Sequence, residues 1–64
     1  MTKQEILDKI EHEIRMLQGN IARISITDSE IERRERKGNA AKNLFELRYY
    51  LIALTAVIED DLDV

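Results

Sequence analysis

The most apolar part of the chain is the segment Leu44–Ile58, which reads LFELRYYLIALTAVI. Twelve of its fifteen residues are apolar, and the three exceptions are Glu46, Arg48 and Thr55. At 100° per residue Glu46 lies roughly opposite the other two, so these exceptions do not form a single polar face. A helix that is apolar nearly all round is buried on more than one side. We therefore predict that this segment packs against more than one neighbouring helix.

Two rows of apolar residues have the alternating spacing of three and four that marks one stripe of an α-helix. The first row consists of Leu7, Ile10, Ile14, Leu17, Ile21 and Ile24. The second row consists of Ala40, Leu44, Leu47, Leu51, Leu54 and Ile58. Two rows of matched length predict two paired helices, and therefore an all-α fold.

Capping signals set the expected helix bounds, which are residues 2–24, 28–37 and 40–60 within one domain, 1–64. Thr27-Asp28-Ser29-Glu30 has the S/T-x-x-E order of a capping box, so a helix is expected to start near Asp28. Gly38-Asn39 resembles a C-terminal cap or a kink. We favour a break there, which gives a three-helix chain. The alternative is a continuous helix and thus a hairpin whose second arm overhangs the first.

The length of 64 residues places the chain near the size at which one hydrophobic core contributes only a few kcal/mol of net stability. The sequence has no cysteine and one histidine, so neither disulfides nor a histidine-rich metal site can supplement the core. We therefore expect self-association into a bundle, as a homodimer or higher oligomer. The predicted interface with a second copy or another protein is Leu44, Phe45, Leu47, Tyr49, Leu51, Ile52, Leu54 and Ile58.

Several function classes are excluded by what the sequence lacks. It contains no nucleophile elbow and no glycine-rich phosphate loop, so we predict no enzyme activity and no cofactor. His12 lies four residues after Asp8, but no second pair of metal ligands accompanies them, so no metal site is predicted. No apolar run reaches the ~20 residues that span a bilayer, and we expect a cytoplasmic protein with no membrane contact.

The formal net charge of -3 gives no overall attraction to nucleic acid. The one basic patch comprises Arg33, Arg34, Arg36 and Lys37. It could contact phosphates, but glutamates are interleaved with it, so a solvated helix face is the favoured interpretation. A protein partner is thus expected ahead of nucleic acid. Small acidic helical chains resemble accessory proteins of phages and plasmids, some of which inhibit host factors. We predict a non-enzymatic regulator, inhibitor or adaptor.

The opening Met1-Thr2-Lys3-Gln4-Glu5, the overall length and the acidic end resemble the Rop family of plasmid RNA-binding proteins. That resemblance implies a homodimer of helical hairpins forming a four-helix bundle, and RNA binding as the alternative function. By position, Lys3 and Gln18 match polar residues of the RNA-contacting face of that family. Ile10 and Ile14 depart from its pattern, which has a polar and an aromatic residue there.

Overall fold

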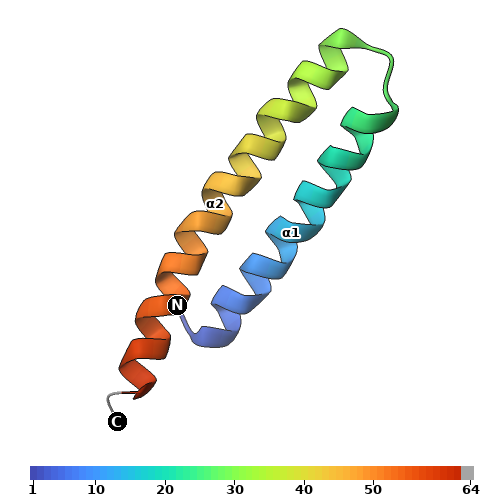
Figure 1. The fold of residues 1–64 in the computed structure, drawn as a ribbon. Helices are drawn as coiled ribbons and strands as arrows, with labels where there is room; N and C mark the ends of the chain where they lie inside the picture. Colours follow the sequence, from blue (N-terminus) through green and yellow to red (C-terminus); the bar gives the residue numbers. More distant parts are fainter. Residues whose placement is uncertain (63–64) are drawn as a thin grey trace.

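The computed structural model describes residues 1–62, which form an antiparallel hairpin of two helices (Figure 1). Helix α1 spans Lys3–Ile26 and helix α2 spans Glu30–Leu62. The hairpin is long and thin, with extents of 53 × 15 × 14 Å. Its radius of gyration of 15.1 Å exceeds the ~11 Å expected of a compact domain of this length. The all-α prediction is confirmed, and the chain is a helical hairpin.

Helix α1 begins with a capping box, which explains why it starts where it does. The Thr2 hydroxyl accepts a hydrogen bond from the Glu5 amide at 3.2 Å, and the Glu5 carboxylate accepts one from the Thr2 amide at 3.3 Å. These contacts satisfy two amides that a helix start leaves without partners. The hydrogen bonds from the Thr2 backbone and side chain also lower the pKa of Glu5. The expected helix over residues 2–24 is confirmed to within two residues at each end.

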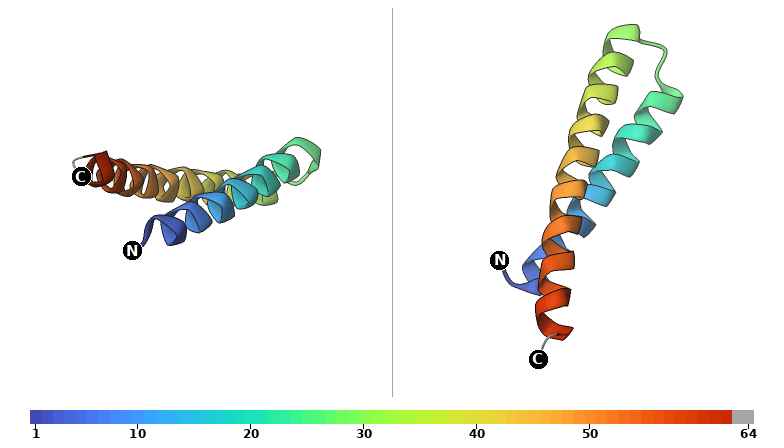
Figure 2. Two further views of the ribbon diagram at one scale, coloured as in Figure 1. Left: turned by 90° about the horizontal axis from the view of Figure 1, so that it is seen from below. Right: turned by 60° about the vertical axis from the view of Figure 1, so that its left-hand side comes forward.

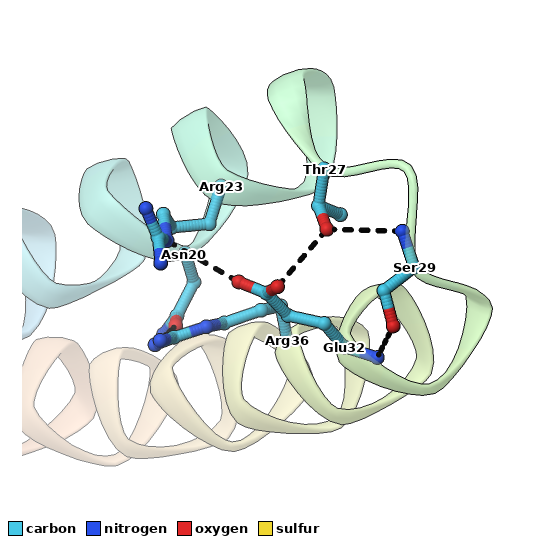
Figure 3. A network of polar contacts seen from close by, with 6 residues as sticks. All are labelled: Asn20, Arg23, Thr27, Ser29, Glu32 and Arg36. Carbon is cyan, nitrogen blue, oxygen red and sulfur yellow. Dashed lines mark hydrogen bonds and ion pairs between the residues drawn. The ribbon is translucent and has the colours of Figure 1, made fainter.

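Helix α2 starts two residues later than predicted. Ser29, not Thr27, provides the N-terminal cap, since its hydroxyl accepts from the Glu32 amide at 3.2 Å. The Thr27 hydroxyl instead accepts from the Ser29 amide and donates to the Glu32 carboxylate (Figure 3). That carboxylate also pairs with Arg23 across the turn, at 3.3 Å. The expected Thr27–Glu30 capping box was therefore wrong. The Thr27 hydroxyl binds the Ser29 amide and the Glu32 carboxylate and does not bind the Glu30 amide.

The predicted break at Gly38-Asn39 was also wrong. Helix α2 continues through both residues, so the expected helices 28–37 and 40–60 are one element. No glycine in the described residues adopts a positive φ, and such a φ is what a glycine cap requires. A glycine inside a helix lowers the stability of the helix by only about 1 kcal/mol relative to alanine. Residues with high helix propensity lie on both sides of Gly38. At 33 residues against 24, α2 overhangs the start of α1, as the continuous-helix alternative implied (Figure 1).

The line along which the helices touch contains half of the apolar row read from α1: Ile10, Leu17 and Ile24 are half-buried in it, whereas the other three residues of that row are exposed. Among the described residues only Ile6 and Asn20 are buried, at 1% and 4% exposure. The part of α1 that faces α2 is the row Ile6, Ile10, Glu13, Leu17, Asn20 and Ile24, all buried or half-buried. We call this the contact row. Figure 2 shows the helices inclined to each other, with no further element on either side of the pair. The hairpin has a narrow contact and little core.

Candidate functional site

One long edge of the hairpin is apolar and exposed. It is formed by residues seven apart on each helix that are between 40% and 56% exposed: Leu7, Ile14 and Ile21 of α1, and Leu44, Leu51 and Ile58 of α2. We call these six residues the apolar edge. Each of the six lies one helical turn from a half-buried apolar residue between the helices. Ile14, for example, is three residues before Leu17, and Leu51 is three residues before Leu54. In an antiparallel pair, these positions of both helices fall on the same side.

A shallow hollow follows the apolar edge along α2. It is lined by Leu44, Leu47, Arg48, Leu51, Ile52 and Thr55. Most of its lining is aliphatic, and it is open along its length, which suits an apolar helix face more than a small polar ligand. The hollow is thus a candidate binding surface for a helix.

The contact between the two helices is held in part by a chain of hydrogen bonds between polar side chains. Arg36 donates to the Asn20 side chain at 3.3 Å, Asn20 donates to Asn43 at 2.8 Å, and Asn43 donates to the Glu13 carboxylate at 2.8 Å. We call these four residues the polar seam. The Arg23–Glu32 ion pair continues these polar contacts toward the turn (Figure 3). Among the described residues that are not exposed, no buried side-chain nitrogen or oxygen lacks a partner.

The polar seam fixes how the two helices are aligned along their length. A shift by one helical turn would separate Asn20 from Asn43 and leave their amides unpaired in a partly buried position. Such a loss costs about 1–3 kcal/mol for each unsatisfied group. The seam therefore specifies the register of the hairpin. The apolar edge provides six of the thirteen large apolar side chains that are exposed among the described residues.

The predicted interface residues divide between two sides of α2. Leu44, Leu51 and Ile58 belong to the apolar edge, and Leu47 and Leu54 are half-buried beside it. Phe45, Tyr49 and Ile52 lie on the side of α2 that faces away from α1, and all three are exposed. The structure therefore does not gather the eight residues into one patch.

The basic patch is likewise divided. Arg33 donates to the Thr27 carbonyl at 2.9 Å and pairs with Glu30 at 2.7 Å, and Arg36 belongs to the polar seam. Arg34 and Lys37 are exposed. Two of the four side chains thus help to hold the turn and the helix pair.

The remaining candidate residues lie on the surface. His12 and Asp8 are exposed, and the Asp8 carboxylate accepts a hydrogen bond from Gln4 at 2.9 Å. Within residues 1–62, no group of three or more potential metal ligands comes together. Neither described helix combines the length and apolarity that crossing a bilayer requires.

Comparison with known proteins identifies no relative of this chain. No protein-family model matches the chain, and no curated protein or solved structure shows significant similarity to it.

Proposed function

We propose that this chain is a cytoplasmic, non-enzymatic protein–protein interaction module that works as a homodimer. In this dimer the apolar edges of two hairpins pack face to face and form a four-helix bundle. Its role is that of a small regulator, inhibitor or adaptor, which acts by occupying a surface of a larger protein. The observation that carries the proposal is the apolar edge itself, which covers residues 7–21 of α1 and 44–58 of α2.

The surface area of one hairpin supports a second copy. A compact monomer of 7.5 kDa exposes about 4200 Å², whereas this chain exposes 5157 Å². The excess is close to the roughly 800 Å² that each partner buries in a protein–protein interface of standard size. Covering the apolar edge with a copy of itself would bring the exposed area of each chain near that of a stable monomer.

The arrangement of polar and apolar residues also supports the dimer. In an isolated helical hairpin, the most apolar row of each helix is expected to face the other helix. Here the buried contact contains Asn20, and Glu13 and Asn43 are half-buried beside it, while Ile14 and Leu51 face outward. This pattern is typical of a helix pair whose main core lies between two pairs, as in a four-helix bundle.

Sedimentation equilibrium over a range of micromolar concentrations tests the dimer. We expect a mass of at least twice 7.5 kDa, together with cooperative thermal unfolding whose midpoint rises with concentration. A compact chain of 7.5 kDa that unfolds cooperatively at every concentration would overturn the proposal.

The role of the dimer is tested by separating protein binding from nucleic-acid binding. We expect the wild-type dimer to retain a specific protein in a pull-down, identified by mass spectrometry, and to bind RNA and duplex DNA only weakly. Steeply salt-dependent RNA binding that is lost on replacing Arg34 and Lys37 by alanine would instead establish a nucleic-acid-binding regulator.

A further inference from the structure

A second apolar row runs along α2 on the side away from α1. Phe45, Tyr49 and Ile52 are 73%, 58% and 64% exposed, and a small hollow between them also involves Arg48. Continuing their spacing of four and three in both directions adds one residue with a small side chain and two charged ones. We call the complete row the far stripe: Lys42, Phe45, Tyr49, Ile52, Ala56 and Glu59.

The far stripe and the apolar edge cannot be covered by the same neighbour. At 100° per residue, the centre of the far stripe lies about 130° around α2 from the row that contains Leu44, Leu51 and Ile58. The dimer proposed above covers that row and the flank of Ile52 that lines its hollow, and it leaves Phe45 and Tyr49 in water. Exposed aromatic and branched side chains at coiled-coil spacing are typical of a helix–helix contact.

We propose that the far stripe pairs with the far stripe of another copy in an antiparallel arrangement, so that dimers assemble further. The row is self-complementary about a point midway between Tyr49 and Ile52. When two copies are aligned there, Lys42 lies opposite the second copy's Glu59. In the same alignment, Phe45 lies opposite the second copy's Ala56, and Tyr49 lies opposite its Ile52.

Charge and size both favour this alignment over a parallel one. An antiparallel pair places opposite charges together at both ends and a large side chain against a small one inside. A parallel pair would place Lys42 against Lys42 and Phe45 against Phe45. Within the part of the chain that the structure describes, neither Lys42 nor Glu59 forms an ion pair, so both are available. Exposed ion pairs add little affinity, but they select the direction of pairing.

The contact along the far stripe is smaller than the proposed dimer interface. From residue 42 to residue 59 the helix rises about 26 Å, and one helix of each copy takes part. Interfaces of this kind belong to the small, weak class. Assembly beyond the dimer is therefore a second step that requires higher concentration. Two different two-fold contacts generate either a closed tetramer or an open chain of hairpins.

Charge reversal tests the pairing and its direction. Lys42→Glu and Glu59→Lys each place like charges at both ends of the contact, so each should weaken the second step about tenfold. An equimolar mixture of the two variants restores one attractive set of pairs and should recover assembly. Lys9→Glu, the same change on the exposed surface of α1, is the matched control and should assemble as the wild type does. The measurement is sedimentation velocity against concentration, with circular dichroism to verify helicity.

Phe45→Asp is the second variant, because it removes the largest apolar side chain of the far stripe and should stop assembly at the dimer. The inference is overturned when Lys42→Glu and Phe45→Asp assemble as the wild type does, or when the mixture of charge variants fails to recover. If the wild type stops at a dimer and Phe45→Asp is a folded monomer, the dimer forms through the far stripe, and the proposed dimer through the apolar edge is refuted.

If the wild type stops at a dimer and Phe45→Asp is also a dimer, the dimer through the apolar edge stands, and pairing through the far stripe is refuted.

Discussion

Leu51→Asp distinguishes most directly between an isolated hairpin and a dimer through the apolar edge. Leu51 is 51% exposed in the single hairpin and lies in the middle of that edge. Ile31→Asp is the matched control. It makes a similar apolar-to-acidic change on the same helix, at a side chain that is 82% exposed and lies outside the apolar edge.

The two assemblies predict different magnitudes. In an isolated hairpin only about half of the Leu51 side chain is removed from water, so its loss costs about 1 kcal/mol. In the dimer the rest of the side chain is buried as well, and an unpaired carboxylate would take its place in both copies. Together these effects amount to roughly 5 kcal/mol per dimer, which weakens dimerisation by three to four powers of ten.

The assay combines sedimentation equilibrium with circular dichroism at matched concentrations. We expect Leu51→Asp to sediment as a monomer with much of its helix content lost, and Ile31→Asp to behave as the wild type. Equal mass and equal stability in the two variants would refute the reasoning, because the apolar edge would then be an ordinary exposed surface.

Three further predictions concern single positions in the hairpin. Asn20→Ala should reduce the free energy of unfolding by about 1–2 kcal/mol in urea titrations, because it leaves Asn43 without its donor in the polar seam; an unchanged midpoint would contradict this role. Gly38→Ala should raise the free energy of unfolding by about 0.5–1 kcal/mol, since nothing lies within 4 Å of the added methyl group; a lower melting temperature would indicate a hidden contact. The pKa of Glu5, measured by NMR titration, should lie below its usual 4.5 and rise toward that value in Thr2→Ala. Because this pKa is lower in the folded state, the capping box stabilises α1 above the unfolded pKa, and that stabilisation is lost as the pH falls through the folded one.

The sequence predicted the presence of the helices well, but it predicted poorly where α2 begins and whether it continues through Gly38. The spacing of Leu7, Ile14 and Leu51 marks helical stripes whatever surrounds them, so an all-α fold with two paired helices could be predicted. The continuity of α2 through Gly38 could not, because a local preference of about 1 kcal/mol is easily outweighed by the helix on both sides. The choice of Ser29 over Thr27 as cap could not be read from the sequence, because the Thr27 hydroxyl contacts the Glu32 carboxylate only once the chain has turned.

The polar seam was the part of the candidate site that sequence reasoning missed. When each helix is considered alone, Asn20 and Asn43 resemble solvent-exposed residues. A side-chain amide is buried only where a hydrogen-bond partner is available, and here the partner is on the other helix. The available signal was the spacing from Ile6 through Ile10, Glu13 and Leu17 to Asn20, which is as regular as that of the apolar row beside it. Of the apolar row predicted on α1, every second residue, such as Leu17, lies in the helix contact, and the residues between them, such as Ile14, lie at its edge.

Few residues are buried within one hairpin, so in the proposed dimer the folding of each chain would depend on the concentration of the protein. In the proposed dimer, most of the apolar contacts of each chain come from another chain, so the folded fraction depends on the total amount of protein present. Dilution would expose the backbone to proteases, and newly made chains would be short-lived until enough of them had accumulated. If the dimer forms as proposed, halving production would lower the amount of folded protein by more than half, and the protein would be sensitive to gene dosage.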